Sequence, residues 1–206
     1  MIEFIIGTSL AASAGLNAWM PLFLLGLADR ILPAVTLPAS WSWLSGDIAL
    51  WILGGLLALE IVADKIPAVD SVNDVIQSIL RPASGGIAFG AGSGAQTIAV
   101  DDPAAFFTDN TWVPVVTGVV IALVVHVIKA TARVAANATT GGLAAPVLSS
   151  AEDGASFALA AAAIVVPVVA ALLLIGLAVA MVVILRRRAR RRRDRTAPSS
   201  AEEFRA

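Results

Sequence analysis

Ionisable side chains gather in one stretch of this chain, LEIVADKIPAVDSVNDVIQSILRP, which covers residues 59–82. Long apolar runs lie on both sides of this stretch, so its charges are unusual for their surroundings. Charged groups beside hydrocarbon normally pair with one another or line a wet cavity, where they form paths for ions or protons. The stretch carries six charged side chains: Glu60, Asp64, Lys65, Asp70, Asp74 and Arg81.

Spacing places most of these groups on one side of a helix. Pro67 predicts where that helix begins, because it holds Ile66 extended and is tolerated in the first helical turn. The polar residues that follow recur at i, i+3, i+4, i+7 and i+11, which is one narrow stripe. They are Asp70, Asn73, Asp74, Gln77 and Arg81. Glu60 and Asp64 precede the stripe as a carboxylate pair four residues apart.

A second polar stripe is largely basic. His126, Lys129, Arg133 and Asn137 follow i, i+3, i+7 and i+11 at the end of the apolar run WVPVVTGVVIALVV. Two stripes of opposite sign, each attached to an apolar helix, predict a shared polar pathway across a helical bundle. Two other interpretations stay open: residues 66–82 can lie on the membrane surface as an amphipathic helix, and the basic side chains can extend to the headgroups.

Other kinds of site find less support in the sequence. His126 is the only histidine and there is no cysteine, so a metal site would rest on Glu60 and Asp64 alone. No serine-hydrolase, metalloprotease or phosphate-binding motif occurs. We therefore expect no enzyme activity, no metal, no cofactor and no catalytic residue.

Composition predicts the fold class. The chain is 58% hydrophobic and 14% charged, with a mean hydropathy of +0.87, whereas soluble domains have about 25% charged residues. A membrane helix needs about 20 apolar residues. We expect an all-α, polytopic transmembrane bundle with about five spans, including a broken or re-entrant segment. The expected spans are 4–27, 46–64, 83–100, 112–132 and 154–185.

Two of these spans carry local signals. Gly86, Gly90 and Gly94 predict either close packing of 83–100 against another helix or a broken segment that lines a cavity. Pro167 predicts a kink in 154–185, which is too short for two full spans. The preceding residues 134–153 are the better candidate for a re-entrant loop. Within them, Ser149 with Glu152 and Ser150 with Asp153 match the spacing of a helix capping box.

The C-terminal tail predicts orientation. Residues 186–195 contain eight arginines, and basic residues beside a membrane helix stay on the cytoplasmic side. We expect residues 1–185 to form the membrane domain and 186–206 a basic, then polar and disordered cytoplasmic tail. Five spans would then leave Lys65, Arg81, Lys129 and Arg133 outside, against the usual bias. The tail is a candidate contact for anionic lipids rather than nucleic acid, through Arg186, Arg187, Arg188, Arg190, Arg191, Arg192 and Arg193.

Three segments carry a family resemblance: SAGLNAWMPLFLLGLADR, the stretch 59–82, and NATTGGLAAPVLSSAED. They resemble the signature blocks of an uncharacterised domain-of-unknown-function family of small bacterial multi-pass membrane proteins. The resemblance implies location in the cell membrane and no particular activity. Two functions remain: a small transporter or channel for an ion or polar solute, and a non-transporting membrane scaffold with an interfacial amphipathic helix. Assembly into a homo-oligomer stays open in both.

Overall fold

The described chain is a bundle of helices without strands. The computed structural model describes residues 1–97, 100 and 112–196, and among them the side chains of 67–74 and 188–196 lie outside the description. The α-helices are α1 (Ile2–Leu16), α2 (Met20–Ile31), α3 (Asp47–Ala63), α4 (Pro67–Ser93), α5 (Trp112–Thr140), α6 (Ala145–Val165) and α7 (Pro167–Thr196). A 3-10 helix, η1 (Ser42–Ser45), lies between α2 and α3. The all-helical fold class is confirmed.

The expected first span, 4–27, is broken into α1 and α2, so the expectation of one helix there is wrong. Asn17 lies between them in an extended conformation, and its side-chain oxygen accepts hydrogen bonds from the backbone N–H groups of Trp19 and Met20. Pro21 disfavours a continuous helix because its ring would clash with the carbonyl of Asn17, four residues earlier. With 15 and 12 residues, neither helix reaches the roughly 20 residues that a span requires.

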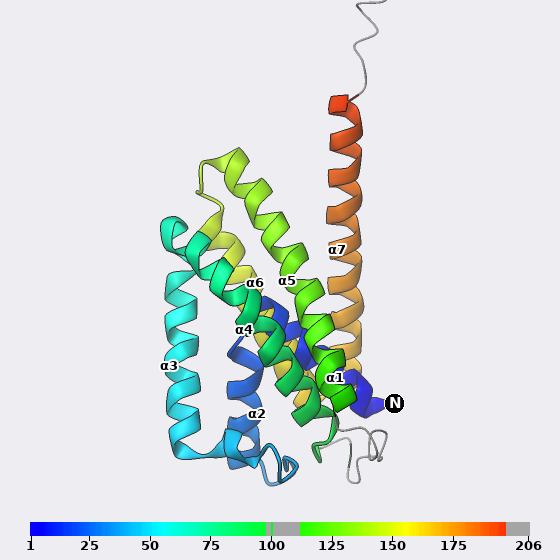
Figure 1. Ribbon diagram of the computed structural model, residues 1–206. Helices are drawn as coiled ribbons and strands as arrows, with labels where there is room; N and C mark the ends of the chain where they lie inside the picture. Colours follow the sequence, from blue (N-terminus) through cyan, green and yellow to red (C-terminus); the bar gives the residue numbers. More distant parts are fainter. Residues whose placement is uncertain (98–99, 101–111, 197–206) are drawn as a thin grey trace, which may run out of the picture.

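Figure 1 shows how α1 and α2 meet inside the bundle. The N-terminus lies at the lower end, α1 rises to the interior, and α2 returns to the lower end. α1 packs against α4, α5 and α6 and is buried from Ser9 to Leu16. The two short helices therefore form a re-entrant pair whose break lies deep in the protein.

The remaining helices run alternately between the two ends of the bundle. In Figure 1, α3 rises, α4 descends obliquely, α5 rises, α6 descends and α7 rises. Three helices in the described part are long and apolar enough to cross a membrane, namely α5, α6 and the Pro167–Arg187 part of α7. The protein is therefore a membrane protein.

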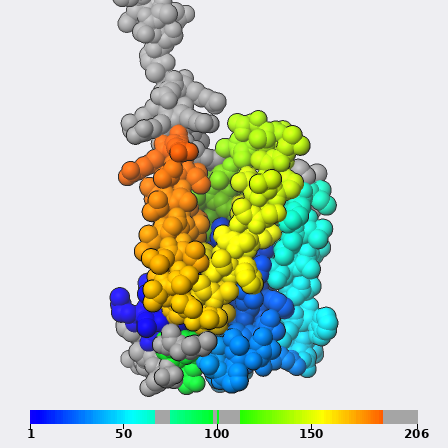
Figure 2. Space-filling model, turned by 180° about the vertical axis from the view of Figure 1, so that it is seen from behind, coloured from blue at the N-terminus to red at the C-terminus, as the bar shows by residue number. Residues whose placement is uncertain are grey.

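The expected span 154–185 is two helices rather than one kinked helix. α6 ends at Val165 and α7 begins at Pro167, and the chain reverses direction there (Figures 1 and 2). Figure 2 shows α6 and α7 side by side along one face. The length argument failed because α6 begins nine residues before the apolar run, at Ala145, and includes Glu152 and Asp153. The expected re-entrant loop at 134–153 is likewise wrong, since only a short turn separates α5 from α6.

α4 contains both the predicted amphipathic helix that begins at Pro67 and the start of the expected span 83–100, which the sequence analysis treated as separate elements. Pro67 begins it and Ile66 is extended, as predicted, but the helix continues through Pro82 to Ser93. The expected span 83–100 is therefore not a separate helix: its first eleven residues, up to Ser93, are the last part of α4, and 94–97 lie outside any helix. Its glycines serve close packing: Gly85 and Gly118 face each other, and a Cβ on Gly118 would lie 2.2 Å from the Gly85 carbonyl oxygen. This contact joins α4 to α5, while Gly86 and Gly90 pack against Val115.

A candidate charged site beside the helix break

Glu60 connects the end of α3 to the break between α1 and α2. Its Oε2 accepts a hydrogen bond from the Ala18 backbone N–H at 3.1 Å. Its Oε1 accepts one from Arg81 Nη2 of α4 at 2.9 Å. The side chains of Glu60 and Arg81 are 1% and 0% exposed, so this ion pair is sealed inside the bundle. The break in the first two helices thus supplies a backbone donor to a buried carboxylate.

Asp64 continues the cluster one helical turn beyond Glu60. Its Oδ2 lies 3.3 Å from Arg133 Nη2, 3.6 Å from Arg81 Nη2 and 3.7 Å from Lys129 Nζ. One carboxylate oxygen of α3 therefore meets three cations from α4 and α5. Removing water from one charge costs several kcal/mol, and such a group persists in a protein interior only when it is well paired.

Glu152 of α6 completes the pairing. Its Oε2 accepts hydrogen bonds from Arg133 Nη2 at 2.6 Å and Arg133 Nε at 3.0 Å, and it lies 3.1 Å from Lys129 Nζ. Lys129 also donates to the Leu16 carbonyl at the end of α1, at 2.7 Å. This carbonyl belongs to the last turn of a helix, where backbone acceptors lack intrahelical donors. Lys129 thus joins α5 to the re-entrant pair.

We call these six side chains the charged network. Three are acidic and three basic, so the network is neutral when all are ionised: Glu60, Asp64, Glu152, Arg81, Lys129 and Arg133. Glu152 is 15% exposed, and the other five are no more than 2% exposed. Four helices, α3 to α6, contribute to it.

His126 extends the network along α5. Arg81 Nη1 lies 3.3 Å from His126 Nδ1, and Ser78 Oγ lies 3.1 Å from His126 Nε2. Guanidinium groups only donate hydrogen bonds, so Nδ1 is the acceptor and Nε2 carries the hydrogen of a neutral ring. Two nearby polar atoms, Arg81 Nε and Gln77 Oε1, are buried without a hydrogen-bond partner in the described part of the chain.

A smaller cluster surrounds Asn17. Its Nδ2 donates to Asp153 Oδ1 at 3.0 Å, and Asp153 Oδ2 accepts from Lys65 Nζ at 3.4 Å. Asn17 therefore holds α6 through its amide nitrogen and the start of α2 through its oxygen. Polar groups at the break therefore form hydrogen bonds with Glu60 of α3, with Lys129 of α5 and with Asp153 of α6.

The two predicted stripes partly meet, and the second stripe also contacts Asp64, which precedes the first stripe. Arg81 of the first stripe and His126 of the second are in contact, while Lys129 and Arg133 face Asp64. Gln77 and Arg81 are buried, which favours an inward-facing stripe over a helix lying in the membrane surface. The predicted pairing of Lys129 and Arg133 with Asp70 and Asp74 stays a prediction. The side chains of Asp70, Asn73 and Asp74 lie outside the described residues.

The sequence also led to one wrong assignment near the network. Glu152 and Asp153 were expected to cap a helix with Ser149 and Ser150, but all four lie inside α6. Instead, Glu152 pairs with cations of α5 and Asp153 with Lys65 in the α3–α4 turn. A signal was present in the sequence: Glu152 and Asp153 directly precede an apolar run, as Glu60 and Asp64 end one. Asn137 is only partly buried, and its Oδ1 has no partner among the described residues.

The charged network pairs its carboxylates with cations and contains several groups that can exchange protons. Among the described residues, no group of three or more His, Asp or Glu side chains is placed to hold a metal ion. The carboxylates already face guanidinium or ammonium groups, which compete with any cation. The carboxylates, the imidazole and the ammonium group are all able to exchange protons.

Fold and site together define a helical membrane protein with a buried ion-pair network beside a broken helix. A family model described as "Domain of unknown function (DUF4126)" matches residues 4–187, and the chain belongs to this family. No curated protein and no solved structure matches it.

Proposed function

We propose that the protein is a small transporter or channel for an ion or polar solute, with the charged network as its path. The observation that carries this proposal is the buried Glu60–Arg81 pair, which the break between α1 and α2 contacts directly. Charged residues in membrane proteins mark ion and proton pathways. Broken helices whose free backbone groups face the binding site are a recurring feature of transporters.

A proton is the ion that this geometry supports best. The network contacts range from 2.6 to 3.7 Å, which leaves no room for a hydrated ion between the paired groups. A proton can pass between carboxylates, an imidazole and water without such room. In this mechanism protonation of Glu60 weakens its pairing with Arg81, and the re-entrant pair moves relative to α3.

The distribution of basic residues supports an orientation in the cell membrane with the C-terminus in the cytoplasm. Lys65 in the α3–α4 turn lies at the same end of the bundle as the α5–α6 turn and the end of α7 (Figure 1). Arg186 and Arg187 lie near that end of α7. With α6 and α7 as separate helices, Lys65 and the arginines at the end of α7 lie on the same side, which supports this orientation. This end fits the positive-inside rule.

The test is reconstitution into liposomes. Purified protein is placed in vesicles that contain a pH-sensitive dye, and a potassium diffusion potential is applied. We expect proton uptake above that of protein-free vesicles. Currents on a supported membrane, with sodium, potassium and chloride tested in turn, cover the other ions. No flux of any ion above the protein-free control would overturn the proposal.

The alternative of a membrane scaffold has its own supporting observation. In the most apolar 18-residue stretch of α7, only 6% of the residues are buried. Side chains such as Leu172 and Val168 are 65% and 72% exposed. Such a surface can be covered either by lipid or by a helix of a partner protein, for example α7 of a second copy of this chain. A scaffold predicts a stable oligomer after crosslinking in native membranes and no flux in the liposome assay.

A further inference from the structure

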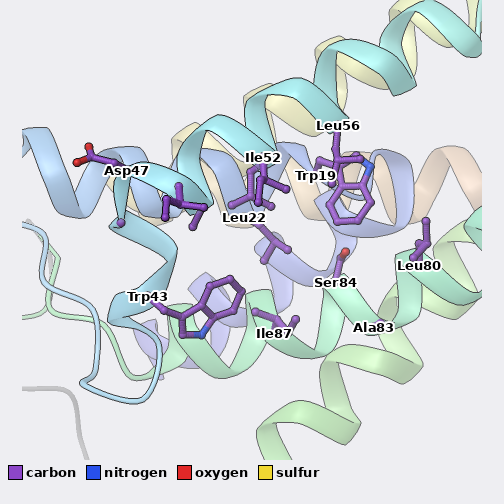
Figure 3. A pocket seen from close by; sticks show the side chains of 14 residues that line it. Trp19, Leu22, Trp43, Asp47, Ile52, Leu56, Leu80, Ala83, Ser84 and Ile87 are labelled. Atoms are coloured by element: carbon purple, nitrogen blue, oxygen red, sulfur yellow. The ribbon is translucent and has the colours of Figure 1, made fainter.

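A second feature of the bundle lies away from the charged network. A groove of about 840 Å³ opens between α2, α3 and α4 (Figure 3). Leu22, Ile52 and Ile87 contribute to its three walls, one from each helix, and nearly all the other lining side chains are apolar as well. The volume is in the range of pockets that hold small molecules, about 300–1,000 Å³.

The groove exists because α3 and α4 diverge. The two helices are joined by a short turn at the upper end of Figure 1, and α4 then slopes away from α3 toward the lower end. α2 forms the floor, where Gly26 allows close approach to η1: a Cβ there would lie 2.2 Å from the Leu44 carbonyl oxygen. The groove between the diverging helices is open to the outer surface of the bundle, where lipid lies, and Ile52 in its wall is 55% exposed.

We propose that this groove binds one acyl chain of a zwitterionic phospholipid such as phosphatidylethanolamine. The lining residues of α3 run from Asp47 to Leu56, which at about 1.5 Å per residue is roughly 14 Å. This length is about half of the roughly 30 Å hydrocarbon core, the depth of one leaflet. One chain entering from the lower end therefore fills the groove to its inner end.

The outer end of the groove fits a zwitterionic head group. Asp47 lies at that end in Figure 3, and Trp43 also lines the groove, on the side of Ile87. Arg30 of α2 pairs with Asp47, and the two side chains are 47% and 75% exposed. Phosphate is a preferred partner of arginine, and the carboxylate complements the ammonium group. Tryptophan is enriched at the level of the head groups. Asp47 would repel a purely anionic head group.

The inner end of the groove adjoins the charged network without opening into it. Trp19, Leu56 and Leu80 line that end. Trp19 follows Ala18, whose N–H binds Glu60, and Leu80 directly precedes Arg81. Leu56 lies one helical turn before Glu60. The side chains of Glu60 and Arg81 are 1% and 0% exposed, so the chain tip packs against a closed wall. The lipid therefore supports the break rather than following the polar path.

Native mass spectrometry of the full chain tests this site. The detergent-purified protein is mixed with phosphatidylethanolamine, phosphatidylglycerol or a free fatty acid at equal concentration. We expect one retained phosphatidylethanolamine per chain, bound more tightly than the other two. Equal retention of all three, or preference for phosphatidylglycerol, would overturn the proposed head-group contact.

Matched variants locate the lipid. Ala49→Phe with Ala83→Leu fills the groove, whereas Ala58→Leu adds volume on an exposed part of α3 outside it. We expect the first to weaken retention about tenfold, a change of about 1.4 kcal/mol, and the second to leave it unchanged. Arg30→Gln with Asp47→Asn should remove the preference for phosphatidylethanolamine. Unchanged retention in the groove-filled protein contradicts the proposal.

A measurement on a protein whose groove is not filled guards against misfolding of these variants; Trp43, which lines the groove, is replaced there only by another aromatic residue. Trp41, Trp43, Trp51 and Trp112 are replaced by phenylalanine, so that Trp19 alone reports. Phosphatidylethanolamine brominated near the chain end should quench Trp19 more strongly than lipid brominated near the head group. Equal quenching by both lipids, or none, would show that no chain reaches the inner end.

Discussion

Arg133 is the residue whose pairing holds the charged network together most directly. It donates to Glu152 through two nitrogens and lies 3.3 Å from Asp64, with its side chain 1% exposed. Lys129 lies beside both acids as well, and Asp64 also lies 3.6 Å from Arg81. The stability of the network should therefore depend strongly on this guanidinium.

We predict that Arg133→Gln destabilises the detergent-solubilised protein by on the order of 3 kcal/mol, the lower end of the cost of breaking a buried pair, because Lys129 stays beside both acids. Arg30→Gln is the matched control, since its pair with Asp47 is exposed and should contribute less than about 1 kcal/mol. Unfolding in increasing denaturant, followed by circular dichroism, measures both. Equal effects of the two substitutions would show that the network is not buried.

Glu152 and Arg133 should also be energetically coupled. Glu152→Gln with Arg133→Gln leaves neither partner unpaired, so the double variant should lose less than the sum of the single losses. We expect a coupling free energy of about 1 kcal/mol or more from a double-mutant cycle. Simple additivity would mean that the two side chains do not meet in the membrane-embedded protein.

Single residues were predictable from sequence where the determinant was local. Pro67 fixed its own helix start, and the period of the second stripe placed His126, Lys129 and Arg133 on one buried side. Glu152 was not predictable in the same way, because its partners lie on another helix and only tertiary packing brings them together. Its local spacing from Ser149 suggested a capping role that the interior of α6 does not require.

At the scale of elements, the sequence did not predict the break between α1 and α2 or the reversal between α6 and α7. Hydropathy is uniform across 4–27 and 154–185, so it carries no information about a change of direction. Asn17 and Pro21 held the relevant signal for the first break, and Pro167 for the second. A proline in an apolar run predicts a kink, a break or a reversal equally well, and the packing of neighbouring helices decides among them.

Close contact between α4 and α5 gives an element-scale prediction. Gly118→Ala places a Cβ 2.2 Å from the Gly85 carbonyl oxygen and 2.6 Å from Phe89 Cβ, so the two helices must separate. We expect a loss of about 1–3 kcal/mol, typical of overpacking. Gly154→Ala in α6 meets no atom within 4 Å and should stabilise by up to about 1 kcal/mol through helix propensity. Thermal melting of both variants in detergent tests the contact, and a neutral Gly118→Ala would contradict it.

The whole molecule has two ends that should face opposite sides of the membrane. The exposed Ala39 lies between α2 and η1, a connection at the lower end of Figure 1, and the exposed Ala138 lies in the last turn of α5, whose end is at the upper end. The native chain has no cysteine, so Ala39→Cys and Ala138→Cys each provide one reactive thiol. We predict that a membrane-impermeant thiol reagent labels Ala39→Cys in intact cells and Ala138→Cys only after lysis. Labelling of both from outside would contradict the topology.

A reporter fused after Ala206 tests the same orientation from the C-terminus. Basic residues near Arg186 should retain that end in the cytoplasm. A fluorescent protein that folds only in the cytoplasm should therefore fluoresce, and alkaline phosphatase in the same place should be inactive. Active phosphatase would reverse the assignment of the two ends.

The central claim is that the buried charges carry an ion through the membrane, and potential-driven proton flux in liposomes tests it most directly. Glu60→Gln keeps the size of the side chain and its ability to accept the Ala18 hydrogen bond, but it removes the titratable charge opposite Arg81. Glu3→Gln is the control, since Glu3 pairs with the N-terminal amine at the edge of the bundle. We predict flux in the native protein and in Glu3→Gln, and at least a tenfold loss in Glu60→Gln that still elutes as a folded species. Equal flux in the Glu60→Gln protein would contradict the account.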